Sequence, residues 1–259
     1  MLNITPDEIH LWFVYFDEIY EESLLERYRS LLTAEERLQE KRYYFPKDQR
    51  CYLITRAMVR TVLSRYAQVE PDQWTFSKNA YGKPEIAEHH ALKNISFNIS
   101  HTKSLIVLGV TCGGGALGVD TENIRTREAP IELVTQYFAP NEAAAIYDVP
   151  KESQDQKFYQ FWTLKESYVK ARGMGLSIPL NEFGFHLGHN REIEVSINPY
   201  LNDSASRWNF WQLRPSADYL VAVCAERTSV AKQEFVMKKL VPLEKEEPMD
   251  CAMLCESVS

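Results

Sequence analysis

The sequence lacks long hydrophobic runs and an excess of basic residues. Its uninterrupted apolar stretches, such as residues 105–110, are far short of the ~18 residues that a membrane-spanning helix needs. Lys and Arg number 29 against 36 Asp and Glu, giving a net charge of −7, whereas a dedicated nucleic-acid binder normally carries a basic excess. We therefore expect neither a membrane nor a nucleic acid as a partner, although a local basic pocket for a phosphorylated small molecule remains compatible with this charge.

The sequence also lacks the cysteine patterns of disulfide frameworks and zinc sites. It has five cysteines, an odd number, and no CxxC pair, so neither kind of site is indicated. Residues 1–8 do not combine the basic and apolar regions of a secretory signal peptide. From these absences we expect a cytoplasmic protein with reduced thiols.

Material for a hydrophobic core is abundant: 45% of the 259 residues are hydrophobic and 12% are aromatic. This length suits one large or two modest domains. Thr33 to Glu36 form a capping-box pattern that predicts a helix start, and apolar spacing predicts a helix over 49–67. A strong helix is expected at 156–172, and strands are expected at 96–100, 104–111, 116–120, 182–187, 191–197, 207–213 and 218–225.

The order of a long helix followed by strands occurs twice along the chain. This repetition favours an α+β fold made of two related halves that join near residues 112–118. We assign residues 1–115 to an N-terminal lobe and residues 116–242 to a C-terminal lobe. Residues 243–259 begin with a charged run and show no periodicity, so a loose tail is expected there.

Two carboxylates, Asp120 and Glu122, follow an apolar strand pattern at residues 116–119. Side chains alternate between the faces of a strand, so both carboxylates point the same way if the strand extends that far. Such a pair suits Mg²⁺, which prefers a few carboxylates together with waters and phosphate oxygens. The other interpretation, a polar strand end that leads into a loop, stays open on spacing alone.

Glu166 and Lys170 lie four residues apart in an aromatic-rich helical segment, so they share one helix face. At the edge of a buried aromatic face, they could hold a metal and a phosphate. A surface ion pair is the commoner meaning of this spacing.

Ser100 and His101 are adjacent in the segment Phe97-Asn98-Ile99-Ser100-His101. Neighbouring strand residues point to opposite faces, so this pair does not form a nucleophilic dyad of the serine-hydrolase kind. Binding of a phosphate at the end of a strand is the better functional interpretation.

These three segments occur in the order Phe-Asn-Ile-Ser-His (97–101), Gly-Val-Asp-Thr-Glu (118–122) and Trp-Thr-Leu-Lys-Glu-Ser-Tyr-Val-Lys (162–170), followed by Gly-Met-Gly-Leu at 173–176. Together with Tyr-Gly-Lys-Pro at 81–84 and Tyr-Phe-Ala-Pro-Asn-Glu at 137–142, they closely resemble the 4'-phosphopantetheinyl transferase superfamily, specifically its long surfactin-type branch. The resemblance covers roughly residues 10 to 225. It implies a pseudo-dimeric, two-lobed α+β fold in which each lobe is a β-sheet packed with a long helix.

The resemblance also implies a reaction. Coenzyme A transfers its phosphopantetheine arm to a serine of an apo carrier protein or carrier domain of the acyl, peptidyl or aryl kind, and adenosine 3',5'-bisphosphate is released. By motif, Asp120, Glu122 and Glu166 would bind Mg²⁺, and Glu166 would also be the general base. Lys170 would neutralise the pyrophosphate and protonate the leaving phosphate. Glu142 matches an acidic position near the metal, with a role left open.

By the same resemblance, Lys83, Ser100 and His101 would hold the 3'-phosphate and adenosine end of coenzyme A. Arg50 is a looser match for a basic residue that serves that phosphate. The sequence departs from some relatives at Glu36 and Gln39, where those relatives have lysines. Basic neighbours that could substitute are Arg37, Lys41 and Arg42.

Two other functions stay open at this point. One is a different Mg²⁺-dependent phosphoryl or nucleotidyl transferase, although no Walker-type loop supports it. The other is a catalytically silent module that binds carrier proteins, which would have no need of Asp120, Glu122, Glu166 and Lys170 together. The internal duplication favours a monomer, because two lobes would supply what other branches build from separate subunits.

Overall fold

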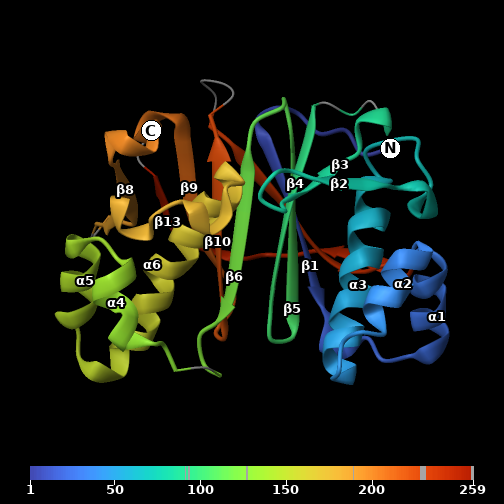
Figure 1. Ribbon diagram of the computed structural model, residues 1–259, viewed down its shortest axis with the longest axis horizontal. Helices are drawn as coiled ribbons and strands as arrows, with labels where there is room; N and C mark the ends of the chain where they lie inside the picture. The colour runs from blue at the N-terminus through green and yellow to red at the C-terminus, as the bar shows by residue number, and fades with distance from the viewer. Residues whose placement is uncertain (91, 93, 127, 189, 228–231, 258–259) are drawn as a thin grey trace.

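A computed structural model describes residues 1–90, 92, 94–126, 128–188, 190–227 and 232–257. Two large sheets stand side by side at its centre, each covered on its outer side by helices (Figure 1). The first sheet has the strand order β12-β11-β1-β5-β4. Its strands are β1 (Glu8–Tyr15), β4 (Ile95–Thr102), β5 (Leu105–Cys112), β11 (Glu234–Val241) and β12 (Lys245–Pro248).

The second sheet has the order β6-β10-β9-β13-β8-β7. Its strands are β6 (Leu117–Asn123), β7 (Phe183–Leu187), β8 (Glu192–Ile197), β9 (Trp208–Ser216), β10 (Tyr219–Glu226) and β13 (Ala252–Ser257). A small third sheet pairs β2 (Phe76–Lys78) with β3 (Pro84–Ile86). The mixed α+β architecture, with a sheet and a long helix in each half, confirms the predicted fold class.

Helices α1 (Glu22–Ser30), α2 (Ala34–Glu40) and α3 (Pro46–Leu63) belong to the first half, and α4 (Val134–Tyr137), α5 (Pro140–Tyr147) and α6 (Lys151–Arg172) to the second. The capping box of Thr33 and Glu36 is present at the start of α2. Helix α6 ends at Gly173, which adopts the left-handed conformation at φ 65° that favours glycine. No helix in the described part of the chain is long and apolar enough to cross a membrane.

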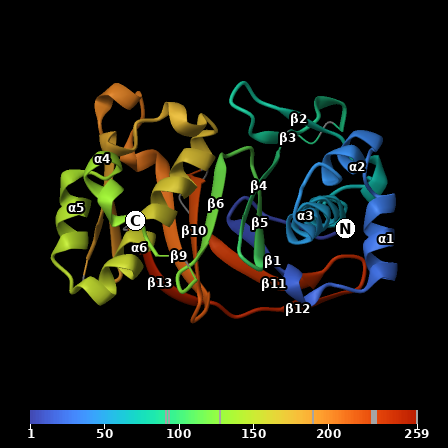
Figure 2. The ribbon, with the colours of Figure 1, turned by 60° about the horizontal axis from the view of Figure 1, so that its bottom comes forward.

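The C-terminal segment differs from the prediction of a loose tail. Residues 245–248 form β12 and residues 252–257 form β13, which pairs antiparallel with β9 and parallel with β8. Figure 2 shows this segment running from the first sheet across to the second. The charged residues of β12 hid the strand from sequence analysis, because an edge strand exposed to solvent often carries charges. Residues 258 and 259 of the predicted tail lie outside the described residues.

Strand β11 falls in the range assigned to the C-terminal lobe, yet it pairs in parallel with β1 of the first sheet. The chain therefore leaves the second half, adds β11 and β12 to the first sheet, and returns as β13. The division into lobes at 1–115 and 116–242 stays a prediction about folding units.

Three hydrophobic clusters hold these layers together. One packs α1 and α3 against the first sheet, and another packs α5 and α6 against the second. The third consists of strand residues from both sheets, among them Leu11, Val107, Val119 and Val221. Because successive strand side chains point to opposite faces, β1 directs Leu11 towards the other sheet and Trp12 towards the helices.

A buried ion pair lies inside the second half. Lys165 of α6 and Glu142 of α5 are both fully buried, with Lys165 Nζ 2.7 Å from Glu142 Oε2. Lys165 Nζ also donates to the carbonyl oxygens of Leu180 and Phe183, each at 2.7 Å. Glu142 accepts from the backbone N–H groups of Ala139 and Phe185. Every charge in this network has several partners, as burial of an ion pair requires.

Helix α6 approaches strand β6 most closely at Gly118. A Cβ atom at this position would overlap the carbonyl oxygen of Ser167 and the backbone nitrogen of Ala171. Only a residue without a side chain therefore lets the two backbones meet. This contact fixes the height of the C-terminal half of α6 above β6.

We expect Gly118→Ala to push α6 away from β6 and to lower the free energy of unfolding by about 1–3 kcal/mol, as overpacking does. Denaturant titration measures this. Gly188→Ala is the matched control, because its new Cβ would meet its nearest neighbours at 3.7 Å, and we expect a change within about 0.5 kcal/mol. Equal effects of the two substitutions would contradict the close-approach argument.

We expect Lys165→Met to lower the free energy of unfolding by about 3–5 kcal/mol, since it leaves the Glu142 carboxylate buried without its counter-charge. The double variant Glu142→Gln/Lys165→Met should recover part of this loss, because the neutral amide oxygen still accepts a backbone hydrogen bond. Urea unfolding of the three proteins tests this. A double variant less stable than Lys165→Met would refute it.

Candidate active site

Four of the predicted residues meet at the seam between the two sheets. Asp120 lies on β6, Glu166 and Lys170 lie on the facing side of α6, and Ser100 comes from β4 of the other half. Lys170 Nζ donates to Asp120 Oδ1 at 2.6 Å and to Ser100 Oγ at 2.8 Å. Ser100 Oγ in turn donates to Asp120 Oδ1 at 3.1 Å. The site is thus built from both halves of the chain.

The charges of this cluster are largely removed from water. Asp120 is only 5% exposed, and its Oδ2 atom is buried with no hydrogen-bond partner among the described residues. Burial raises the pKa of Glu166, the negative charge of Asp120 raises it further, and Lys170 opposes both effects. Two neighbouring carboxylates with an unpartnered oxygen are chemically suited to a cation.

Glu122 lies on the same face of β6 as Asp120, because the strand continues to Asn123. Its Oε2 atom accepts a hydrogen bond from Thr102 Oγ1 at 3.4 Å. In the described part of the chain, no three His, Cys, Asp or Glu side chains converge closely enough to hold a metal by themselves. Mg²⁺ commonly uses one or two carboxylates and completes its shell with water and substrate phosphates, so the residues present still fit this ion.

Ser100 and His101 point to opposite faces of β4. Ser100 faces Asp120 and Lys170, whereas His101 lines a cavity of about 640 Å³ beside α3. Desolvation lowers the pKa of His101, and the positive charge of Lys170 lowers it further. The adjacent Ser and His therefore form no dyad.

Lys83 reaches the seam from the loop before β3. Its Nζ donates to the carbonyl oxygens of Leu117 at 3.0 Å and Ala171 at 3.3 Å, and burial lowers the pKa of Lys83 to about 8. Lys83 also lines a cavity of about 290 Å³ together with Glu166 and Lys170. The structure thus brings Lys83 next to the catalytic candidates.

Arg50 lies apart from this cluster. It faces Asp17, with its Nη2 atom 3.4 Å from Asp17 Oδ1, and Lys47 contacts the same carboxylate. The sequence suggested a phosphate as the partner of Arg50, but in the structure this arginine pairs with the acidic side chain of Asp17.

A basic cavity of about 720 Å³ was not predicted. Four basic residues line it, Arg42, Arg56, Arg60 and Lys78, together with the two acidic residues Glu35 and Glu36. Arg60 is 1% exposed and pairs with Glu36 at 2.6 Å, so this arginine is not on a solvated face of α3. The signal in the sequence was the spacing of Arg56 and Arg60, four residues apart on one helix face.

The basic cavity and the cavity beside Glu166 and Lys170 border the same loop of residues 81–84, because Gly82 and Pro84 line both. Of the basic residues considered as substitutes for the missing lysines, Arg42 lines this cavity. Arg37 instead donates from Nε to the carbonyl oxygen of Leu32.

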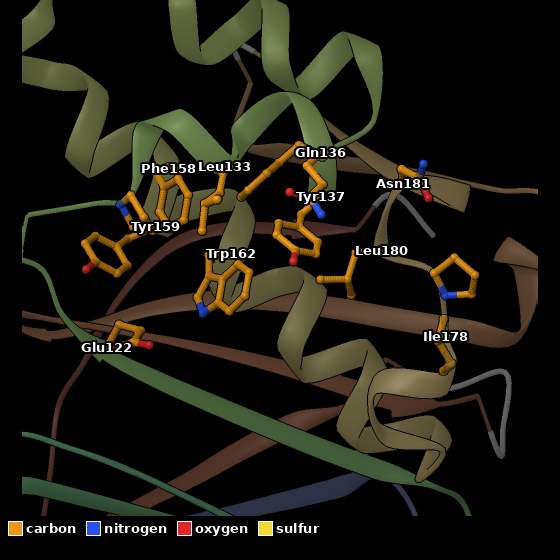
Figure 3. Close-up of a pocket in the computed structure, with 13 residues that line it drawn as sticks. Glu122, Leu133, Gln136, Tyr137, Phe158, Tyr159, Trp162, Ile178, Leu180 and Asn181 are labelled. Carbon is orange, nitrogen blue, oxygen red and sulfur yellow. The ribbon is translucent and has the colours of Figure 1, made fainter.

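Glu122 also lines an apolar cavity of about 590 Å³. Figure 3 shows Glu122 at one edge of it, with Trp162 and Tyr159 of α6 among the side chains that line it. The apolar cavity therefore borders Glu122, whereas the basic cavity borders the loop of residues 81–84.

Glu142 does not join the site. Its carboxylate is fully buried in the ion pair with Lys165 and caps α5 at Ala139. Its match to an acidic position near the metal was misleading, because the same residue type here closes a network inside the second half.

Comparisons with known proteins agree with this geometry. The 4'-phosphopantetheinyl transferase superfamily matches residues 116–224, and the 4'-phosphopantetheinyl transferase N-terminal family matches residues 21–112. A likeness to the Thermotoga maritima holo-[acyl-carrier-protein] synthase structure covers 53% of this chain and 84% of that one, at a TM-score of 0.34 and 13% identity.

Two curated relatives align along most of their length. The 4'-phosphopantetheinyl transferase HetI of Nostoc sp. is 29% identical, over 86% of this chain and 89% of HetI. The 4'-phosphopantetheinyl transferase Sfp of Bacillus subtilis is 30% identical, over 82% of this chain and 90% of Sfp. The chain therefore belongs to the 4'-phosphopantetheinyl transferase family and is an enzyme of that class.

Proposed function

We propose that this enzyme moves the phosphopantetheine arm of coenzyme A to a serine hydroxyl of an apo carrier protein in a Mg²⁺-dependent reaction, with Asp120, Glu166 and Lys170 at the reacting pyrophosphate. The observation that carries this proposal is the contact of Lys170 with Asp120 beside a Glu166 of raised pKa. Phosphoryl transfer depends mainly on positioning and charge stabilisation, and this cluster supplies both.

Asp120 and Glu166 would hold the metal, with Glu122 beside them on β6. When bound there, Mg²⁺ supplies positive charge that neutralises the pyrophosphate oxygens. The Oδ2 atom of Asp120 has no donor among the residues that the structure describes, and this supports the assignment, because a buried carboxylate oxygen without a donor is suited to a cation.

The remaining chemistry falls to protein side chains. The serine oxygen of the carrier attacks the phosphorus that bears the pantetheine arm, while the bond from this phosphorus to the bridging oxygen of the pyrophosphate breaks. Glu166 accepts the serine proton, and its raised pKa suits a general base. Lys170 neutralises the departing phosphate and donates a proton to it, so adenosine 3',5'-bisphosphate leaves.

The adenosine end of coenzyme A would extend along the loop of residues 81–84. Lys83 and His101 border the neighbouring cavities, and Arg42 and Arg56 supply guanidinium groups for the 3'-phosphate. Ser100 faces Lys170 and would lie near the pyrophosphate. Arg50, paired with Asp17, is the weakest member of the set that the sequence assigned to this phosphate.

We further propose that the enzyme is a cytoplasmic monomer whose partners are apo acyl or peptidyl carrier proteins. The seam between its own two halves supports the monomer, since one chain already contributes side chains from both sides. Carrier proteins are generally acidic, so an enzyme of net charge −7 must meet them through a locally neutral or basic surface.

Asp120→Asn and Glu166→Gln should each lower transfer by at least about 100-fold, because each removes charge stabilisation or base chemistry. The assay is intact-mass spectrometry of an apo carrier protein incubated with the enzyme, coenzyme A and Mg²⁺, and EDTA should abolish the mass gain. Glu152→Gln, an exposed position on the same helix, is the control and should change the rate less than about twofold. A wild-type enzyme that binds coenzyme A but modifies no carrier would favour a silent binding module.

Arg56→Gln should raise the KM for coenzyme A about 10- to 150-fold, since a charge-assisted hydrogen bond to the 3'-phosphate contributes about 1.5–3 kcal/mol. With 3'-dephospho-coenzyme A as donor, the variant and wild type should behave alike. Arg27→Gln, on an exposed arginine of α1, is the control. An equal penalty on both donors would remove Arg56 from the phosphate site.

A further inference from the structure

The two large sheets meet at β4 and β6, the terminal strands of their respective sheets. Among the described strand pairings, no backbone hydrogen bonds join β4 to β6. Strand β6 pairs with β10 along one edge, and its other edge, which faces β4, pairs with no described strand. Unpaired edge N–H groups need other partners when they are buried. The side chains of β4 provide them.

Three alternate N–H groups of β6 donate to three alternate side chains of β4. The rungs are Val119 N to Asn98 Oδ1 at 2.7 Å, Thr121 N to Ser100 Oγ at 3.2 Å, and Asn123 N to Thr102 Oγ1 at 3.2 Å. The donors on β6 and the acceptors on β4 both occur at every second residue. They form a ladder in which side-chain oxygens take the place of the backbone carbonyls of an ordinary sheet. It fixes the register of β6 against the other half of the molecule.

Two rungs also bind the carboxylates of the site. Ser100 Oγ donates to Asp120 Oδ1, and Thr102 Oγ1 donates to Glu122 Oε2 at 3.4 Å. A hydroxyl has one proton and two acceptor positions. Because Thr102 accepts from the N–H of Asn123, its proton is free to be directed at Glu122. The same hydroxyl thus holds the backbone of β6 and orients a carboxylate.

We propose that Thr102 is a positioning residue of this enzyme. It acts through Glu122 by holding that carboxylate towards the metal and the pyrophosphate, and this rests on the proposed Mg²⁺-dependent function. Partners of this kind, which orient a metal-binding group, typically change metal affinity 10–100-fold when they are removed. Thr102 comes from the half of the chain opposite to Glu122, so the ladder couples the placement of the halves to the metal site.

The test compares Thr102→Val, which keeps the shape and removes the hydroxyl, with Thr102→Ser, which keeps the hydroxyl. Mn²⁺ binding to the full chain with coenzyme A present is measured by electron paramagnetic resonance, without any carrier protein. We expect Thr102→Val to raise the Kd for Mn²⁺ about tenfold or more and Thr102→Ser to stay within about twofold of wild type. In the transfer assay, Thr102→Val should raise the half-saturating Mg²⁺ concentration and leave the KM for coenzyme A at saturating Mg²⁺ within about twofold.

Thr61→Val is the matched control, because Thr61 is a buried threonine of α3 whose hydroxyl donates to backbone carbonyls within its own helix. The Thr61→Val variant should bind Mn²⁺ with the wild-type Kd, even if its melting temperature is lower than that of wild type. If Thr102→Val binds Mn²⁺ like wild type, or Thr102→Ser binds it as weakly as Thr102→Val, the positioning role is overturned. A wild-type enzyme that binds Mn²⁺ with coenzyme A but transfers no phosphopantetheine would instead overturn the proposed function.

Discussion

The close approach of helix α6 to strand β6 is the constraint on which the proposed active site depends. At Gly118 the strand has no side chain, so the backbone of the helix between Ser167 and Ala171 can lie directly against it. Asp120 is two residues further along the strand on the same face. The 2.6 Å contact from Lys170 Nζ to Asp120 Oδ1 therefore follows from a contact between backbones, which is stiffer than one between long side chains.

The electrostatics of the seam follow from the same packing. Asp120, Glu166 and Lys170 are held together at a largely buried position. Two carboxylates beside one ammonium group give the cluster a net negative charge. The basic cavity bordered by Arg42 and Arg56 adjoins the loop of residues 81–84, which also borders Glu166 and Lys170 through its own cavity. The site thus separates a region suited to a cation from a region suited to an anion, which a donor with a pyrophosphate and a distant phosphate requires. Net charge gives no hint of this, since it sums over the whole surface.

Sequence reasoning located the catalytic candidates because their spacings are local. Asp120 with Glu122 on a strand, and Glu166 with Lys170 on a helix, follow from periods of two and about four. It did not identify the hydrogen bonds of Asn98 and Thr102 to the backbone of β6, because their partners lie on the other sheet. Nor could it distinguish Glu142, an acid buried against Lys165, from an acid at a metal. Such distinctions depend on long-range packing, as does the pairing of β13 between β9 and β8.

The asymmetry between the halves explains what one chain gains over two identical subunits. At the seam, β4 contributes side chains that accept hydrogen bonds, whereas β6 contributes its backbone edge and the carboxylates. In a symmetric dimer, one sequence would have to supply both surfaces. Covalent linkage lets each half specialise, and the crossing of the chain into β11 and back to β13 ties the specialised halves together. In the proposed mechanism, the ladder between β4 and β6 is therefore as necessary as the carboxylates that it positions.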